Sequence, residues 1–226
     1  MAGESGEMAI NNIKEQIADL LFPRYCLSCR REGEWLCEKC LITLPVGKRQ
    51  LFLPVGVGGI EVTALFDYDQ LLMGKIIAAL KYNFAFDLSR TVHRLVSEVK
   101  LTEQIGNDPT VLVPVPLHRR RYLWRGFNQA EIIAQALAAA NSSWSVCPDL
   151  LRRVIYSKPQ VGQKQKDRVR SVQGVFRINL ERLSDNWNKR IILVDDVLTT
   201  GSTLSECAEV LKTAGFAEIS GFVLAT

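Results

Sequence analysis

The stretch ILVDDVLTTGST, residues 192–203, joins an apolar run to two adjacent aspartates and then to hydroxyl side chains around a single glycine. The apolar run predicts a buried strand, and the polar residues after it predict a loop and then a helix that begins near Thr203. In a parallel α/β sheet, such a loop brings backbone N–H groups and a helix N-terminus to the carboxyl edge, where they favour an anion. The stretch therefore predicts an α/β fold and an anion site.

Strands and helices alternate through the rest of the chain. The expected strands are 61–68, 111–116, 190–194 and 218–225, and the expected helices are 71–81, 88–101, 129–140 and 203–213. Asn128 is a predicted N-cap, and Gly215 is a predicted left-handed helix end. Residues 45–59 are rich in Gly and Pro and are expected to form a loop. This alternation predicts a parallel sheet within a domain that spans residues 60–226.

A separate N-terminal module is expected over residues 1–50. Apolar residues at helical spacing predict an amphipathic helix over 9–21. Four cysteines then form two C-x-x-C motifs, whose spacing suits one tetrahedral, structural Zn²⁺ ion. These predicted ligands are Cys26, Cys29, Cys37 and Cys40. A redox pair or unligated thiols are the alternatives, and Cys147 and Cys207 are expected to be packing residues.

The positive charge of the chain is concentrated in two windows. The net charge is only +4, but residues 117–125 contain four arginines and no acid, and residues 151–177 contain eight cations and one acid. The two windows carry +11 together, so the rest of the chain carries −7. This concentration favours an anionic ligand, whether phosphate, pyrophosphate or nucleic acid, and the alternative is a solvated loop face.

The loop after the predicted strand at 190–194 suits a single phosphate group. Its hydroxyl groups can donate hydrogen bonds, and Gly201 lets the backbone approach an anion closely. The spaced glycines and the lysine of a P-loop are missing, and so is the GxGxxG turn of dinucleotide-binding folds. The predicted phosphate-binding residues are Thr199, Thr200, Gly201, Ser202 and Thr203.

Asp195 and Asp196 need a different explanation, because a carboxylate repels phosphate. Each carboxylate can accept a hydrogen bond from a hydroxyl group. The pair therefore suits the two adjacent hydroxyls of a ribose whose 5′-phosphate occupies the loop. The alternative is that one aspartate caps the helix and the other is merely exposed.

DDVLTTGST resembles the phosphoribosyl-pyrophosphate (PRPP) signature of type I phosphoribosyltransferases, and the chain resembles the ComF family over almost its whole length. The resemblance rests on the paired C-x-x-C motifs, LKY at 80–82, VPVPLHRRRYLWRGFNQA at 113–130, the segment from SKPQ to GVF at 157–176, and ILVDDVLTTGST. It implies the type I phosphoribosyltransferase fold for the larger domain. The implied ligand of the loop is then PRPP or ribose-5-phosphate.

The resemblance also implies roles for other residues. The loop at 115–118 would bind pyrophosphate, with Mg²⁺ held by oxygens of the substrate and by water. The implied pyrophosphate-binding residues are Pro116, Leu117, His118, Arg121 and Arg125. The expected catalytic residues are Lys81, Gln160 and Arg168. The expected nucleic-acid contacts are Arg119, Arg120, Arg121, Tyr122 and Trp124, although aromatic residues beside a buried strand can instead belong to the core.

These features lead to three hypotheses about function. The first is a ComF-like protein that binds PRPP or ribose-5-phosphate and handles single-stranded DNA during natural transformation. The second is an active phosphoribosyltransferase with an unidentified acceptor. The third is a zinc-stapled interaction module on a degenerate enzyme fold, which binds a helicase-like partner through the helix at 9–21. Four of the six cysteines lie in one short cluster, which suggests a metal site in a reducing compartment, so we expect a cytoplasmic protein. No run of apolar residues approaches the roughly 18 that a membrane span needs, so we expect no insertion into a membrane.

Overall fold

The computed structural model of the chain describes residues 23–56, 58–82, 88–98, 108–155, 174–182 and 189–226. The predicted helix at 9–21 lies outside these residues, as do Gln160 and Arg168. The chain forms two compact units, residues 1–44 and residues 45–226, and the predicted loop at 45–59 belongs to the larger one. In the described part of the chain, no helix is long and apolar enough to cross a membrane.

In the first unit, Tyr25 and Glu32 form an antiparallel bridge, and one turn of helix, α2 (Glu38–Leu41), comes after it. Leu36 and Leu41 are buried beside these elements. One C-x-x-C motif therefore lies in the turn that the bridge closes, and the other lies at the start of α2.

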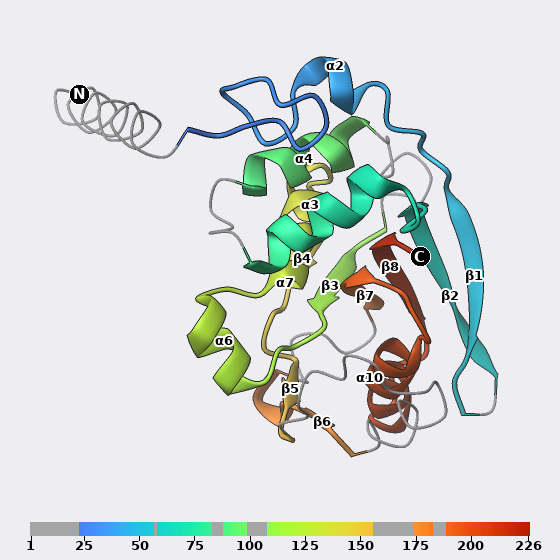
Figure 1. Ribbon diagram of the computed structural model, residues 1–226. Coiled ribbons are helices and arrows are strands. Elements are labelled where there is room, and N and C mark those ends of the chain that lie inside the picture. The colour runs from blue at the N-terminus through green and yellow to red at the C-terminus, as the bar shows by residue number, and fades with distance from the viewer. Residues whose placement is uncertain (1–22, 57, 83–87, 99–107, 156–173, 183–188) are drawn as a thin grey trace, which may run out of the picture. The chain divides into compact units, whose positions relative to one another are not determined.

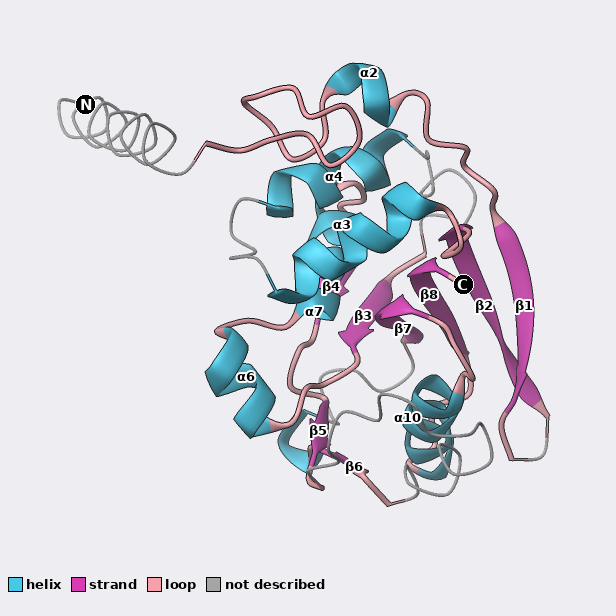
Figure 2. Cartoon of the chain, viewed as in Figure 1, coloured by secondary structure: helices cyan, strands magenta, loops and turns pink. Residues whose placement is uncertain are grey.

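The second unit is built on a six-stranded sheet with the order β1-β2-β8-β7-β3-β4. Its strands are β1 (Arg49–Pro54), β2 (Gly59–Phe66), β3 (Thr110–Pro114), β4 (Trp144–Val146), β7 (Arg190–Val197) and β8 (Ile219–Ala225). β1 is antiparallel to β2, and every other pair in this order is parallel. Figure 2 shows the strands in magenta. The predicted α/β fold with a parallel sheet is confirmed.

The predicted loop at 45–59 is wrong at its centre, because residues 49–54 form β1. Glycines and prolines flank a short apolar stretch here, so the composition of the whole segment indicates a loop. Leu51 and Leu53 pack against the core, which is what draws this stretch onto the edge of the sheet.

Helices cover both faces of the sheet. Between consecutive parallel strands, β3 connects to β4 through α6 (Arg119–Arg125) and α7 (Gln129–Ala139), and β7 connects to β8 through α10 (Ser202–Thr213). These two connections run in opposite directions along the sheet. Because such crossovers are right-handed, α7 and α10 lie on opposite faces. Figure 1 shows the strands between α10 and the group formed by α3 (Leu71–Tyr82), α4 (Leu88–Glu98) and α7.

The core on the α10 side is formed by alternate residues of the strands. β3 contributes Val111 and Val113, β7 contributes Ile191 and Leu193, and α10 covers them with an apolar face that includes Cys207. Each fully buried aliphatic side chain of this kind contributes about 1.5–3 kcal/mol. The prediction that Cys207 is a packing residue is confirmed, and Cys147 is half-buried against the same core.

The basic window at 151–177 begins and ends in paired strands. β5 (Leu151–Arg153) and β6 (Phe176–Ile178) form a separate antiparallel pair, and Leu151 and Phe176 are buried in the α10-side core. A short 3-10 helix, η1 (Leu180–Arg182), comes after β6. The predicted irregular segment is therefore anchored at both ends.

Both predicted helix boundaries that depend on a particular residue are confirmed. The Asn128 side chain accepts a hydrogen bond from the Ala130 N–H at 3.2 Å, which caps the start of α7. Gly215 has a φ of 99°, the left-handed conformation expected just beyond α10.

Gly201 lies immediately before α10, and two features of the fold require a glycine there. Its φ is 74°, and a Cβ atom on it would lie 2.5 Å from Cδ2 of Leu53 in β1. A residue with a side chain would be strained at this positive φ, and its Cβ atom would overlap with Leu53 of the edge strand. The glycine is therefore needed by the folded chain itself, before any ligand is considered.

Gly201→Ala should lower the free energy of unfolding by about 1–2 kcal/mol for the left-handed backbone, and by about 1–3 kcal/mol more for the overlap with Leu53. The matched control is Gly126→Ala, since Gly126 also has a positive φ, 83°, but nothing within 4 Å of the added Cβ. Urea unfolding measures both losses of stability. Equal losses would contradict the part of the prediction that concerns Leu53.

Candidate functional site

Two loops meet at the carboxyl edge of the sheet, between β3 and β7. Residues 115–118 come after β3, and residues 198–201 come after β7. The Val115 N–H donates to the Val194 carbonyl at 2.8 Å, so the pairing of the two strands continues into the first loop. The connections leave these strands in opposite directions, and open α/β sheets bind ligands at such a point.

The loop after β7 presents hydroxyl groups at the start of α10. The Thr200 and Ser202 hydroxyl oxygens lie 2.9 Å apart, and the Ser202 N–H donates to Thr200 Oγ1 at 3.4 Å. Gly201 provides no side-chain cap, so the first N–H groups of α10 depend on this loop or on a ligand. Thr199 is exposed, and Thr200, Ser202 and Thr203 are half-buried. All five residues of the predicted phosphate loop thus lie together at a helix N-terminus.

The two aspartates lie within β7 rather than after it, because the strand extends to Val197. Neighbouring residues of a strand alternate between the two faces of a sheet, so Asp195 begins on the α10 side and Asp196 on the opposite side. The Asp195 side chain then turns along the strand, and its Oδ1 accepts the Asp196 N–H at 2.9 Å. Asp196 is buried and Asp195 is half-buried.

Lys81, in the last turn of α3, forms an ion pair with Asp196. Its Nζ lies 2.7 Å from Asp196 Oδ2, and the Asp196 side chain is only 7% exposed. Lys81 therefore lies beside the acidic pair. Its expected catalytic role remains a prediction.

Asp195 has an unusual electrostatic environment. Burial, and then the neighbouring charge of Asp196, raise the pKa of the Asp195 carboxyl well above its ordinary value, and Lys81 only partly offsets them. A carboxyl with a strongly raised pKa, next to the predicted phosphate loop, is typical of a functional site.

The loop after β3 is hydrogen-bonded to the start of α7, and it ends at a histidine that caps α6. Pro116 is buried, Leu117 and His118 are half-buried, and the Asn128 amide donates to the Val115 carbonyl at 3.0 Å. His118 Nδ1 accepts the Arg120 N–H at 3.1 Å and so caps α6. Desolvation, followed by the charges of Arg120, Arg153 and Arg121, lowers the pKa of His118. A neutral imidazole fits this accepting role.

α6 divides the arginines of the first basic window. Arg119 and Arg120 are exposed, whereas Arg121 and Arg125 are half-buried, and Arg125 Nη1 donates to Gln129 Oε1. The helix itself was not predicted from the sequence, because its seven residues include no buried one and so have no apolar face that a pattern could reveal.

The two aromatic residues of α6 lie on the surface. Tyr122 is 45% exposed and Trp124 is 74% exposed, so the alternative that they belong to the core is wrong. Residues four apart share one side of a helix, which places Trp124 on the same side as Arg120. A flat aromatic group and a cation are therefore presented together to solvent.

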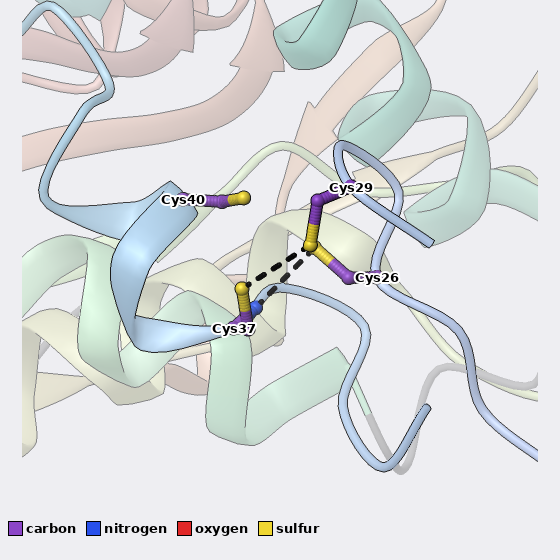
Figure 3. Close-up of side chains that lie close together, drawn as sticks. All are labelled: Cys26, Cys29, Cys37 and Cys40. Atoms are coloured by element: carbon purple, nitrogen blue, oxygen red, sulfur yellow. Dashed lines mark hydrogen bonds between the residues drawn. The ribbon is translucent and has the colours of Figure 1, made fainter. Parts of the chain in front are cut away.

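The four cysteines of the first unit converge. All four Sγ atoms lie within 4.8 Å of one another, and those of Cys29 and Cys37 are 3.6 Å apart (Figure 3). Although burial opposes the effect, backbone N–H groups of Cys37, Cys29 and Ser28 lower the pKa of Cys26 to about 6. Four thiolate donors this close together could hold one metal ion.

One residue near the site was missed by the sequence argument. Glu206, one turn into α10, is buried, and its Oε1 accepts the N–H groups of Val175 at 2.6 Å and Phe176 at 3.4 Å. It thereby ties the start of β6 to the helix that begins at the phosphate loop. The only signal in the sequence was an acid flanking the apolar face of a predicted helix.

Asp195→Asn should stabilise the chain more at about pH 7 than at about pH 4. The unfolded chain releases this proton near its ordinary pKa of 3.8, whereas the folded chain, with its raised pKa, releases it at higher pH. Folding stability is therefore lost as the pH rises through that interval, and asparagine has no proton to release. The measurement is Tm against pH for both chains.

The control for this prediction is Asp196→Asn. It removes the charge that helps to raise the pKa of Asp195, so the loss of stability with rising pH should become smaller than in the unsubstituted chain. A difference between the Asp195→Asn and unsubstituted chains that does not change with pH would contradict the raised pKa.

The sequence was compared with those of known proteins. Residues 87–226 match the family described as phosphoribosyl transferase domain. The chain is 35% identical to Competence protein F of Haemophilus influenzae, over 90% of this chain and 85% of that protein. It is 33% identical to DNA utilization protein YhgH of Escherichia coli, over 88% and 87%. It is 28% identical to Competence protein ComFC of Streptococcus pneumoniae, over 88% and 86%.

The family match covers β3, β7 and both loops at the carboxyl edge of the sheet. The three relatives align with 88–90% of this chain. The chain belongs to the ComF family of proteins that carry a phosphoribosyl transferase domain.

Proposed function

We propose that the chain binds PRPP or ribose-5-phosphate at the carboxyl edge of its sheet and handles single-stranded DNA during DNA uptake in the cytoplasm. The observation that carries the proposal is the meeting of the loops at 115–118 and 198–201, one on each side of the point where the crossovers change direction. The family match supports the ligand class, and relatives named for competence and DNA utilization support the process.

In this proposal, each loop binds one end of PRPP. The 5′-phosphate would lie against the hydroxyls and N–H groups at the start of α10, and the ribose hydroxyls would face Asp195 and Asp196. The pyrophosphate would lie at residues 116–118 with Arg121 nearby. Mg²⁺ would be held by oxygens of PRPP and by water, since it keeps much of its hydration shell.

Single-stranded DNA would bind to the exposed side of α6. Arg119 and Arg120 can neutralise phosphates, and Trp124 offers a base-stacking surface beside Arg120. Arg121 is half-buried, so we assign it to pyrophosphate rather than to DNA. The two anions would then occupy different sides of one short helix.

Transfer of the ribosyl phosphate to an acceptor is a second candidate function. It is favoured by the raised pKa of Asp195 at the acidic pair, because a perturbed carboxyl is suited to proton transfer. A helicase-like partner for the helix at 9–21 remains a prediction from the resemblance alone.

The metal that we propose for the four cysteines is zinc, in a structural role. The set of four thiolates suits Zn²⁺, and the mutual distances of the Sγ atoms, all within 4.8 Å, allow tetrahedral coordination with Zn–S bonds of about 2.3 Å. All four positions would be filled by protein, which leaves no site for a substrate or for catalytic water.

Replacing Arg119 and Arg120 together by alanine should weaken single-stranded DNA binding and flatten its salt dependence, by about 0.7 in log–log slope for each phosphate that is no longer neutralised. The double change should leave PRPP binding intact. Thr200→Val should do the reverse, because it removes one hydroxyl from the phosphate loop. Fluorescence anisotropy across a salt series measures DNA binding, and calorimetry measures PRPP binding.

The control for Thr200→Val is Thr213→Val, since Thr213 is exposed at the other end of α10. If the variant with alanine at both arginines binds DNA with the affinity and salt slope of the unsubstituted chain, α6 is not the DNA-binding surface. Undiminished PRPP affinity in a folded Thr200→Val chain would remove the loop from the proposed site.

Purified protein should contain about one zinc ion per chain, as expected for a site with four cysteine ligands. Cys37→Ser should lose the metal and make residues 23–44 more sensitive to proteolysis, because metal binding supplies much of the folding free energy of such small units. Cys207→Ser is the control, since Cys207 is buried in the other unit. Metal analysis that finds no zinc in protein prepared without chelators would refute the assignment.

A further inference from the structure

The short strand β5 carries two adjacent arginines with different environments. Arg152 is exposed, and its guanidinium lies 3.9 Å from Glu181. Arg153 points to the other side of the strand, as the alternation of a strand requires, and is half-buried. Its guanidinium carbon lies 5.3 Å from the centre of the Phe176 ring, on the paired strand β6. The aromatic ring therefore limits where the Arg153 side chain can go.

Arg153 also lies within the electrostatic reach of both loops. Burial and the charge of Arg121 lower the pKa of Arg153, whereas Asp195 and Glu206 oppose that change. The charge of Arg153 in turn helps to lower the pKa of His118. The charge of one guanidinium thus acts on the loop after β3, on α6 and on the acidic end of β7.

Regular elements, namely the β5–β6 pair and α10, form the surroundings of Arg153. Glu206 on α10 holds the N–H groups of Val175 and Phe176, so the ring that stacks on Arg153 is tied to the helix that starts at the phosphate loop. Figure 1 shows the β5–β6 pair between α6 and α10. An arginine restrained in this way loses little side-chain entropy when it binds a ligand.

We propose that Arg153 binds the pyrophosphate group of PRPP, as an additional binding residue that the motifs of the sequence do not identify. The inference rests on the proposed function, because it needs PRPP to bind between the two loops. Arg121 and Arg153 repel each other, and an anion with several negative charges between them would remove that repulsion. The planar guanidinium can also donate two parallel hydrogen bonds to phosphate oxygens.

The position of Arg153 in the fold favours pyrophosphate as its ligand over the 5′-phosphate of PRPP and over DNA. The 5′-phosphate loop lies at the start of α10, whereas the cationic neighbour of Arg153 is Arg121 and its imidazole neighbour is His118. DNA requires exposed cations, and on β5 the exposed one is Arg152. The two adjacent arginines therefore serve as a matched pair for an experiment.

The experiment measures binding of PRPP and of ribose-5-phosphate, each with Mg²⁺, to the full chain by calorimetry. Arg153→Gln should weaken PRPP binding about tenfold or more, the size expected when hydrogen bonds between charged groups are removed. It should leave ribose-5-phosphate binding unchanged, since that ligand has no pyrophosphate. Arg152→Gln should leave both affinities unchanged.

Arg153→Lys is the second variant, because it keeps a positive charge beside Glu206 if the glutamine variant does not fold. It should weaken PRPP binding about threefold or more, since an ammonium group cannot donate the paired hydrogen bonds of a guanidinium. Thermal unfolding checks that each variant is folded.

The possible outcomes separate this inference from the proposed function. If the unsubstituted chain binds neither ligand, the proposed function fails and this inference fails with it. If the unsubstituted chain binds both ligands and Arg153→Gln and Arg153→Lys bind PRPP as it does, only the role of Arg153 is overturned. Equal losses of PRPP and ribose-5-phosphate affinity in Arg153→Gln would also overturn it, because the arginine would then act on the whole site rather than on pyrophosphate.

Discussion

Parallel pairing of β3 with β7 places two loops from distant parts of the chain side by side. The ladder aligns Thr110 with Arg190 and Pro114 with Val194, and the bond from the Val115 N–H to the Val194 carbonyl carries the pairing into the first loop. The chain leaves these two strands in opposite directions along the sheet, so right-handed crossovers place α7 and α10 on opposite faces. The two loops of the proposed site, at 115–118 and 198–201, both continue from this pair of strands.

Like charges are brought together at this edge at a cost in stability. Asp195 and Asp196 are adjacent acids with little exposure, and one ion pair with Lys81 offsets only part of their repulsion. On the other side, Arg121 and Arg153 repel each other near His118. Such conflicts within a folded chain are typical of functional sites, because a ligand of complementary charge relieves them.

The two basic windows have different structures although their compositions are similar. In the first, α6 turns Arg119 and Arg120 to solvent and keeps Arg121 half-buried. In the second, β5 does the same with Arg152 and Arg153 through the alternation of a strand. Both windows therefore present some cations to solvent and keep others half-buried. Net charge alone does not distinguish these two environments.

Local pattern was enough to identify the parallel α/β fold, the order of most elements, the loop that leads into a helix at 199–203, and the four-cysteine cluster, because strand alternation, helical spacing and C-x-x-C motifs are short-range signals. It did not identify β1, whose short apolar stretch is flanked by glycines and prolines, or α6, which has no buried residue. The contacts of Leu53 with Gly201, of Lys81 with Asp196 and of Glu206 with β6 were also out of reach. Each joins residues far apart in the chain, and only the packing of the sheet and its helices determines which distant side chains meet.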